Sequence, residues 1–596
     1  MTAGCRKLGS FMKKRAGETA VLFFCVAVLC VFVSMKQGWH MDEMLSFELA
    51  NAEYNPWITP LQPEGRLAKF VHNEIDGATL SETLKNLVDT VLDVVRNRGE
   101  SKLLSYKADV YEEPVWITAE QFKAYIQVDD EDDFNYLSVY FNVKDDNHPP
   151  LHFMLVHTVS SVFKGMAEPW MGCLINLIAV IAVMILLMKT GMLLAEVLGL
   201  KYGRWVGILG AGLYGLSSGA ITTTLLIRMY GMLTLWCVAY FYLMLKKWRD
   251  KEFDKRSFPL ILVTMLGFWT QYFFLFYCIV LAAVVSVLLL RGKRLKELWC
   301  FVRSMLVAAV IGIVVFPFAV SDVFSSGRGV EALGNLAAGF SGYGTRLGTF
   351  WDILISRTFF PLIWILLLAL AVLAVCLARR VPKDRGTDSG EDGKKSSVLW
   401  ILIVPPVGYF LLAARMSPYL VDRYIMPIFP FVILWGVLGM AALFGICEKR
   451  LRANHGKWLG AAVFSWVLLL QFVGVFYYDG SYLYQGYEQQ KTAAEYFQEY
   501  PCICIYDGVG YYENLQEFTY YSKTLLLTFE QLESRQDTES IRELDAVAVL
   551  IKDSGSYDVR QVMEIMEQQY GFKTDMMGWR GPGVHNDFLV FMRKDV

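Results

Sequence analysis

Two short polar clusters that contain acids lie next to long apolar segments of this chain. Asp42 and Glu43 follow the first apolar run almost directly, and Asp146 and His148 lead into a Pro-Pro pair. A carboxylate can act as a general base toward a hydroxyl group, with a neighbouring acid to position it. The structural alternative for the first pair is a capped, solvated helix start, because helix N-termini favour acids.

The Pro149-Pro150 pair fixes the chain direction at the second cluster. Proline locks its own φ angle and restricts the residue before it. This rigidity would hold Asp146 and His148 in one orientation at a membrane boundary. The structural alternative is a plain turn that begins a helix, where the missing N–H costs nothing.

Two arginines lie at the ends of apolar runs, each with a tyrosine close behind it. Arg228 precedes Met229 and Tyr230, and Arg423 precedes Tyr424. An arginine at this depth is costly unless it is paired, and a phosphate is a natural bidentate partner for a guanidinium group. Snorkelling to ordinary lipid headgroups is the alternative.

Tyr272 is predicted to lie on the same outer face. It interrupts an apolar stretch together with Thr270 and Gln271. An interfacial belt of aromatic residues explains a tyrosine there equally well. We assign supporting roles to Tyr272, and also to Asp146, Tyr230 and Tyr424.

The acidic run at residues 129–133 is a candidate cation site. Its spacing matches no EF-hand loop, and we prefer to interpret it as a solvated acidic surface. The sequence predicts no metal site and no cofactor. A requirement for a divalent cation stays open.

The composition indicates a membrane protein. Of 596 residues, 55% are hydrophobic and the mean hydropathy is +0.37, whereas soluble proteins contain roughly 45–50% apolar residues. The 56 basic residues nearly balance 58 acidic ones, for a net charge of -2. Such a surface gives nucleic acid nothing to bind. The 11 cysteines are scattered singly, mostly through apolar runs, which excludes a disulfide framework.

Eleven apolar runs are candidates for membrane helices, since a crossing needs about 20 apolar residues. A twelfth, at residues 149–163, is short and is predicted to be a juxtamembrane or re-entrant helix. The eleven runs are residues 20–35, 171–188, 205–226, 231–245, 258–270, 272–290, 300–320, 353–377, 399–412, 425–446 and 459–476.

Basic residues predict the orientation of these helices. They gather at residues 13–15, 246–251, 291–294, 379–383 and 449–452. The positive-inside rule then places the N-terminus in the cytoplasm and the C-terminus outside. We predict a multi-pass protein of the cell membrane, with residues 381–397 as a flexible cytoplasmic linker.

The expected organisation is a basic N-terminus at residues 1–19, a membrane domain at 20–477 that includes an outer loop at 36–148, and an outer domain at 478–596. The outer loop contains an amphipathic helix, for which Thr79 and Glu82 predict a capping box. Its apolar stripe is predicted to pack, and consists of Leu80, Leu84, Leu87, Val88, Val91 and Val95.

The tail alternates helical and strand patterns, which is typical of a small α/β domain. Helices are predicted at residues 489–500 and 559–570. Strands are predicted at residues 502–506, 546–551 and 588–592. Cys502 and Cys504 fall on the same strand face, so we expect buried free thiols. The fold class is therefore a polytopic α-helical membrane protein with a large first outer loop and a C-terminal outer α/β domain.

The order of these features resembles the membrane-embedded glycosyltransferases of the C fold, in the branch of protein O-mannosyltransferases and lipid A aminoarabinose transferases. The likeness covers roughly residues 20–436. It depends on Asp42-Glu43, the His148-Pro149-Pro150-Leu151 turn, Arg228-Met229-Tyr230 and Arg423-Tyr424. The aminoarabinose branch has a lysine at the position of His148.

The resemblance implies that a sugar moves from a polyprenyl-phosphate carrier to an acceptor at the outer face. Asp42 would be the catalytic carboxylate, acting as a single base with inversion, with Glu43 as its acidic neighbour, and His148, Arg228 and Arg423 would bind the donor phosphate. The sugar and the acceptor, which could be a protein, a wall polymer or a lipid, stay open. The alternatives are a polymerase or ligase that uses a lipid diphosphate, a transporter or flippase, and a noncatalytic sensor.

Overall fold

The computed structural model describes residues 16–54, 66–97, 102–107, 114–255, 257–324, 327–337, 339–378, 389–448, 453–508, 510–534, 538–552, 555–580 and 587–594. The chain divides into two compact units. The helical unit contains Met1–Ser34, Asp145–His152 and Cys173–Ser481, and the sheet unit contains Met35–Lys144, Phe153–Gly172 and Tyr482–Val596.

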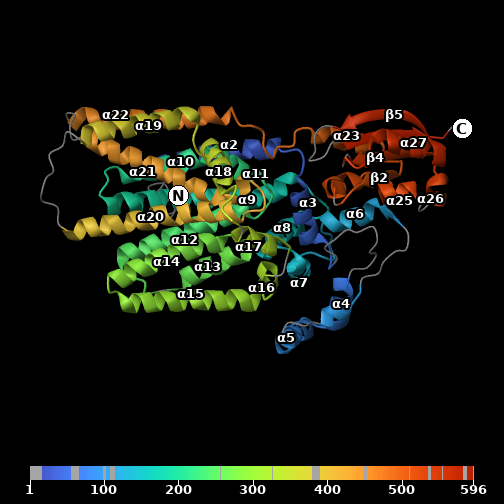
Figure 1. Cartoon of the computed structure of the whole chain (residues 1–596), viewed down its shortest axis with the longest axis horizontal. Coiled ribbons are helices and arrows are strands. Elements are labelled where there is room, and N and C mark those ends of the chain that lie inside the picture. The colour runs from blue at the N-terminus through green and yellow to red at the C-terminus, as the bar shows by residue number, and fades with distance from the viewer. Residues whose placement is uncertain are drawn as a thin grey trace, which may run out of the picture. The chain divides into compact units, whose positions relative to one another are not determined.

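Long apolar helices form the helical unit (Figure 1). Its helices are α2 (Ala16–Met35), α9 (Pro169–Leu198), α10 (Gly203–Gly215), α11 (Ser218–Leu225), α12 (Tyr230–Asp250), α13 (Phe258–Thr270), α14 (Phe274–Arg291), α15 (Leu295–Val315), α16 (Ala319–Phe324), α17 (Gly327–Ala337), α18 (Tyr343–Thr358), α19 (Pro361–Ala378), α20 (Ser389–Met416), η3 (Asp422–Tyr424), η4 (Met426–Ile428), α21 (Phe429–Glu448) and α22 (Ala453–Val475).

Six helices in the described part of the chain are long and apolar enough to cross a membrane. They are α2, α9, α14, α15, residues Lys395–Met416 of α20, and Met426–Gly445. The bent pairs α10–α11 and α18–α19 raise the number to eight if each pair is one crossing. All eleven predicted runs fall on helices, and the chain is a membrane protein. The number and direction of the crossings stay predictions.

Two of the predicted runs contain a sharp bend between two helices. The run at residues 205–226 bends by 57° between α10 and α11, where the Ser217 side chain caps a new helix by accepting from the Ala220 N–H. The run at residues 353–377 bends by 97° between α18 and α19. Pro361 explains this break, because proline lacks an N–H donor and keeps the preceding residue out of the helical region.

The predicted linker at residues 381–397 is wrong over its second half. Helix α20 begins at Ser389, well before the apolar run at 399. Residues 381–388 lie outside the described residues, as do the basic segments at residues 13–15, 379–380 and 449–452.

Small residues allow the closest helix contact in the middle of the chain. A Cβ atom at Gly207 of α10 would lie 2.5 Å from the Met188 carbonyl oxygen of α9, and one at Gly191 would lie 3.0 Å from Gly207 Cα. Helices in membranes associate through such small residues, because lipid provides no hydrophobic drive for association. The pair of glycines fixes how α9 and α10 cross.

The sheet unit combines the outer loop with the tail. Its loop elements are α3 (Met41–Asn51), α4 (Arg66–Glu74), α5 (Leu80–Arg96), η1 (Lys102–Ser105), β1 (Trp116–Thr118), α6 (Ala119–Ile126), α7 (Tyr136–Asn142), η2 (Val143–Asp145) and α8 (Leu151–Val162). Its tail elements are α23 (Tyr487–Tyr496), β2 (Cys502–Tyr506), η5 (Gly510–Asn514), α24 (Leu515–Phe518), β3 (Lys523–Thr528), α25 (Phe529–Glu533), α26 (Thr538–Arg542), β4 (Ala546–Lys552), α27 (Val559–Tyr570), β5 (Lys573–Arg580) and β6 (Asp587–Arg593).

A six-stranded sheet of order β1-β3-β2-β4-β6-β5 forms the centre of this unit. Strands β3, β2 and β4 run parallel, while β1, β6 and β5 pair antiparallel. The predicted α/β tail is confirmed, although β1, β3 and β5 were not predicted. Strand β1 of the outer loop pairs with β3 of the tail, and residues 36–144 of the loop lie in the sheet unit, whereas the sequence division groups the loop with the membrane helices.

The two faces of the sheet have different side chains. Ile503 and Ile505 of β2 face a core that also contains Val562 and Met566 of α27. Alternation along the strand places Cys502 and Cys504 on the opposite face. Both are buried and free of disulfides, as predicted.

The predicted Thr79 is the N-cap residue of helix α5, and its side chain accepts from the Glu82 N–H. The Glu82 side chain accepts from the Ala78 N–H at 3.1 Å. The predicted packing of its apolar stripe is wrong for Leu84 and Val88, which are 53% and 55% exposed. Leu87 of the same stripe is partly buried and packs against the small core that includes residues of α4 and η1.

Lys552 provides a test of how the sheet unit tolerates buried charge. Its Nζ lies 2.9 Å from Asp587 Oδ2 and 3.3 Å from Glu513 Oε2, and it donates to Asn514 Oδ1 at 2.9 Å. Burial by itself lowers the pKa of Lys552. The nearby charges of Asp587 and Glu513 raise the pKa by more, so the net pKa lies above the ordinary value.

We expect Lys552→Met to lower the free energy of unfolding by about 3–5 kcal/mol, because the buried Asp587 and the partly buried Glu513 lose their counter-ion. Chemical unfolding in detergent measures this, and the exposed Lys573→Met is the control. Since the folded pKa of Lys552 is raised, its contribution is complete below the unfolded pKa and is lost only as the pH rises through the folded one. Equal stability of both variants would contradict the structural role.

Candidate functional site

Helix α3 begins with a capping box built on a histidine. The Asp42 N–H donates to His40 Nδ1 at 3.1 Å, and the His40 N–H donates to Glu43 Oε2 at 2.8 Å. Two N–H groups at the helix start therefore have side-chain acceptors. This arrangement uses Glu43 as a capping group and leaves the Asp42 carboxylate outside the box.

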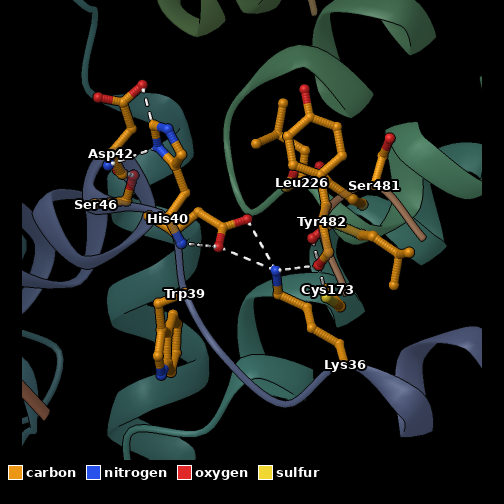
Figure 2. Close-up of polar contacts among 12 residues, drawn as sticks. Lys36, Trp39, His40, Asp42, Ser46, Cys173, Leu226, Ser481 and Tyr482 are labelled. Carbon is orange, nitrogen blue, oxygen red and sulfur yellow. Dashed lines mark hydrogen bonds and ion pairs between the residues drawn. The ribbon is translucent and has the colours of Figure 1, made fainter. Parts of the chain in front are cut away.

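Glu43 also belongs to a buried ion pair. Its Oε2 and Oε1 atoms lie 3.0 and 3.2 Å from Lys36 Nζ, and neither side chain is exposed. Lys36 Nζ also donates to the Tyr482 carbonyl oxygen at 2.8 Å (Figure 2). It lies 4.8 Å from the centre of the Tyr484 ring. A buried charge is stable only when it is paired and hydrogen-bonded, which holds for both members here.

The segment between Lys36 and α3 runs against the start of the tail. The Gln37 N–H donates to the Leu483 carbonyl oxygen at 2.9 Å. A Cβ atom at Gly38 would lie 2.5 Å from Tyr487 Cβ, so only glycine allows this approach. Trp39 Nε1 donates to Gln516 Oε1. We call residues 36–40 the base loop, because they lie at the base of α3 and determine where this helix begins and where its second residue, Asp42, is placed.

Asp42 is the more accessible of the two predicted acids. Its side chain is 22% exposed, whereas that of Glu43 is fully buried. Asp42 Oδ2 lies 3.7 Å from His40 Nδ1, and the Asp42 carbonyl oxygen accepts from Ser46 Oγ at 2.9 Å (Figure 2). Of this pair, Asp42 is the acid that can reach a ligand, and Glu43 positions it.

In the helical unit, two predicted clusters that are 80 residues apart in sequence come together. His148 Nδ1 lies 2.9 Å from Asp146 Oδ2. Arg228 Nη2 lies 3.4 Å from His148 Nδ1 and 3.5 Å from its Nε2. We call Asp146, His148 and Arg228 the basic triad.

Electrostatics keep Asp146 ionised. Burial raises the pKa of its carboxyl, but His148 and Arg228 lower it by more, so the net pKa lies below the ordinary value. The turn that carries Arg228 is held by Asn176, whose side-chain amide donates to the Leu226 carbonyl oxygen and to that of Arg228 at 3.2 Å. The triad therefore holds the Arg228 guanidinium and the His148 ring in fixed positions beside an ionised acid.

Arg423 lies next to aromatic side chains. Its guanidinium carbon is 5.5 Å from the centre of the Tyr424 ring, and Tyr424 contacts Tyr230 edge-on at 6.0 Å. Phe273 contacts the same tyrosine at 5.4 Å. The structure thus brings together the two tyrosines predicted to have supporting roles.

Tyr272 has a partner that the sequence did not indicate. Its hydroxyl donates to Asp322 Oδ2 at 2.6 Å. Asp322 is itself buried. The hydrogen bond therefore fixes the Tyr272 side chain at the break between α13 and α14.

Arg357 of α18 was missed by the sequence reasoning. Its guanidinium lies 3.1 Å from Asp422 Oδ2 and 2.9 Å from Asp479 Oδ2, and it donates to Ser481 Oγ at 2.9 Å. The pairing ties α18 to η3, which carries Arg423. The signal was an arginine followed closely by Pro361, which the prediction of one continuous helix over residues 353–377 obscured.

The acidic run at residues 129–133 forms ion pairs with a lysine. Lys164 Nζ lies 2.7 Å from Asp130 Oδ1 and 2.6 Å from Asp133 Oδ2. Across the described ranges, no group of three or more His, Cys, Asp or Glu side chains is placed to hold a metal ion.

No family model matches the chain, and no curated protein matches it in sequence. Two solved structures of ArnT from Cupriavidus metallidurans are similar to it. The apo structure has a TM-score of 0.41 and 12% identity, and the match covers 75% of this chain and 87% of that chain. The structure bound to undecaprenyl phosphate has a TM-score of 0.40 and 13% identity, with 75% and 88% covered.

We expect Lys36→Met and Glu43→Leu each to lower the free energy of unfolding by about 3–5 kcal/mol, because each leaves its buried partner uncompensated. The double variant should lose clearly less than the sum of the two, since it removes both charges. Chemical unfolding of all four proteins in one detergent measures the coupling. Additive losses would show that the two charges do not interact.

Proposed function

We propose that the protein is a glycosyltransferase that moves a sugar from a polyprenyl-phosphate carrier to an acceptor at the outer face of the membrane. One observation carries this proposal. Two neighbouring acids have separate roles, because Glu43 is used in the ion pair with Lys36 while the Asp42 carboxylate stays accessible. A single positioned carboxylate is what a phosphate leaving group requires.

The chemistry needs one base and no acid. Hydrolysis of an ordinary glycoside uses two carboxylates, because the leaving oxygen must be protonated. A lipid phosphate leaves as a stabilised anion without that help. Asp42 takes the proton of the acceptor hydroxyl, the hydroxyl oxygen bonds to the anomeric carbon from the opposite side, and the bond from that carbon to the phosphate oxygen breaks with its electron pair. The anomeric configuration inverts.

His148 and Arg228 of the basic triad, together with Arg423, are assigned to the donor phosphate. Arg228 provides a planar guanidinium group that suits two phosphate oxygens. His148 lies beside it, and Asp146 fixes the His148 ring by contact with Nδ1. Arg357 is excluded from this role, because two aspartates already contact its guanidinium. In this assignment Tyr272 has a supporting role through its hydrogen bond to Asp322, and Tyr230 and Tyr424 support Arg423.

The proposal places the N-terminus in the cytoplasm and the sheet unit outside the cell. The carrier lies in the membrane, and the protein needs no nucleic acid. The sugar, hexose or pentose, is left open by this assignment.

Asp42→Asn should lower transfer of label from a radiolabelled polyprenyl-phosphate sugar by about 10²- to 10⁴-fold, which is the usual contribution of a general base. Binding of the carrier should stay within two-fold, because the phosphate contacts remain. Transfer is measured with the whole protein in lipid nanodiscs. The matched control is Asp89→Asn on the exposed side of α5, which should transfer normally.

Full transfer by the Asp42→Asn protein would remove Asp42 from the role of base. Absence of transfer by the unchanged protein with every sugar donor, together with release of labelled lipid to the other leaflet, would favour a flippase. Transfer only from a lipid diphosphate would favour a polymerase or ligase.

Arg228→Lys should weaken binding of radiolabelled polyprenyl phosphate by about 10- to 100-fold, as expected for a charged hydrogen bond worth 1.5–3 kcal/mol. Lysine keeps the charge but loses the bidentate geometry. Arg303→Lys, on the exposed face of α15, is the control. Equal binding by both variants would exclude Arg228 as a phosphate ligand.

A further inference from the structure

The sheet unit contains an open cavity of about 510 Å³, within the size range of small-molecule sites. Its walls come from α6, from residues 165–168, and from the tail around α24. We call it the polar pocket. All of its lining residues belong to the sheet unit.

The lining of the polar pocket is mostly polar. Side chains that can exchange hydrogen bonds with a ligand include Glu120, Lys123, Glu168 and Gln498. Most ligand pockets are lined mainly by apolar groups, with a few polar groups for orientation. The opposite balance here fits a ligand covered with hydroxyl groups, and it does not fit a lipid chain.

The charges around the polar pocket nearly cancel. Glu120 and Glu168 are balanced by Lys123 and by Lys491, whose Nζ lies 5.9 Å from the centre of the Tyr520 ring. A polyanion would meet the two carboxylates, and a polycation would meet the two ammonium groups. The balance favours a neutral ligand.

The Tyr520 ring gives the pocket an aromatic surface. It is half-buried and lies among the polar groups of the lining. Sugar rings combine an apolar C–H face with hydroxyl groups at the rim, so an aromatic ring beside amide and carboxylate groups matches both parts. A flexible peptide would instead need apolar subsites for its side chains.

Gln516 connects the polar pocket to the base loop. Its Nε2 donates to the Ala167 carbonyl oxygen at 2.9 Å, and both residues line the pocket. Its Oε1 accepts from Trp39 Nε1 and, at 3.1 Å, from the Tyr487 hydroxyl. Trp39 is three residues before Asp42, so one side chain contacts both the pocket and the loop that positions the base.

We propose that the polar pocket binds a neutral carbohydrate that forms part of the acceptor. This inference rests on the proposed function, and it specifies the acceptor as a glycan. Binding there holds the acceptor on the same framework that sets the position of Asp42 through Gln516 and Trp39.

The test uses the whole protein in lipid nanodiscs with chitotriose and maltotriose as probes, and saturation-transfer NMR as the readout. We expect binding of at least one trisaccharide. Gln498→Ala and Tyr520→Ala should each weaken it by at least ten-fold. Gln568→Ala, an exposed glutamine of α27, is the matched control and should bind normally.

Two results would overturn the pocket assignment: no saturation transfer to either trisaccharide, or equal binding by the Gln498→Ala and control proteins. Gln498 is exposed, so its variant keeps the fold even if Tyr520→Ala does not. Asp42→Asn separates the two proposals, since it should bind the trisaccharide normally while losing transfer. Binding without transfer from any donor would leave the pocket and reject the glycosyltransferase. Transfer without binding would do the reverse.

Discussion

A buried charge next to the first apolar helix determines how the base loop is built. Lys36 follows α2 directly, and its ammonium group is removed from water. Such a charge is stable only with an opposite charge and further acceptors around it. Glu43 provides the opposite charge, and the Tyr482 carbonyl oxygen is a further acceptor. The chain between Lys36 and Glu43 is therefore fixed at both ends, and Asp42 is presented by a helix start that has little freedom to move.

The same physical rule separates the arginines of the helical unit. Each lies close to the end of an apolar helix, where an unpaired guanidinium would be costly. Arg357 meets two aspartates and becomes a structural tie between α18, η3 and the chain at residues 479–481. Arg228 instead meets His148, with a single acid behind that ring. Two direct aspartate contacts give Arg357 a structural role, whereas the phosphate assignment of Arg228 builds on its contact with His148.

Sequence patterns predicted what depends on local chemistry. Apolar runs became helices, and the runs at residues 502–506 and 559–570 became the predicted strand and helix. Contacts between distant segments could not be predicted. Lys36 and Tyr482 are 446 positions apart, and nothing in either local pattern indicates the other. The resemblance separated Asp42 from Glu43, but the residue types alone did not say which carboxylate is buried. The ion pair with Lys36 buries Glu43 and leaves Asp42 accessible. The break before Pro361 carried a local signal, but the length of the apolar run outweighed it.

The tail is part of the framework of the base loop and not an appendage. Strand β1 of the outer loop completes the sheet of the tail at β3, Tyr482 accepts from Lys36, and Gln516 accepts from Trp39. The strand pairing covers an edge of the sheet, and open edges are a liability. The two hydrogen bonds give further acceptors to buried donors, which are costly when they are left unsatisfied. A chain without the tail would leave the Lys36 ammonium with one partner fewer and Trp39 with no acceptor. The order of the base loop, and with it the position of Asp42, therefore depends on residues more than 400 positions away.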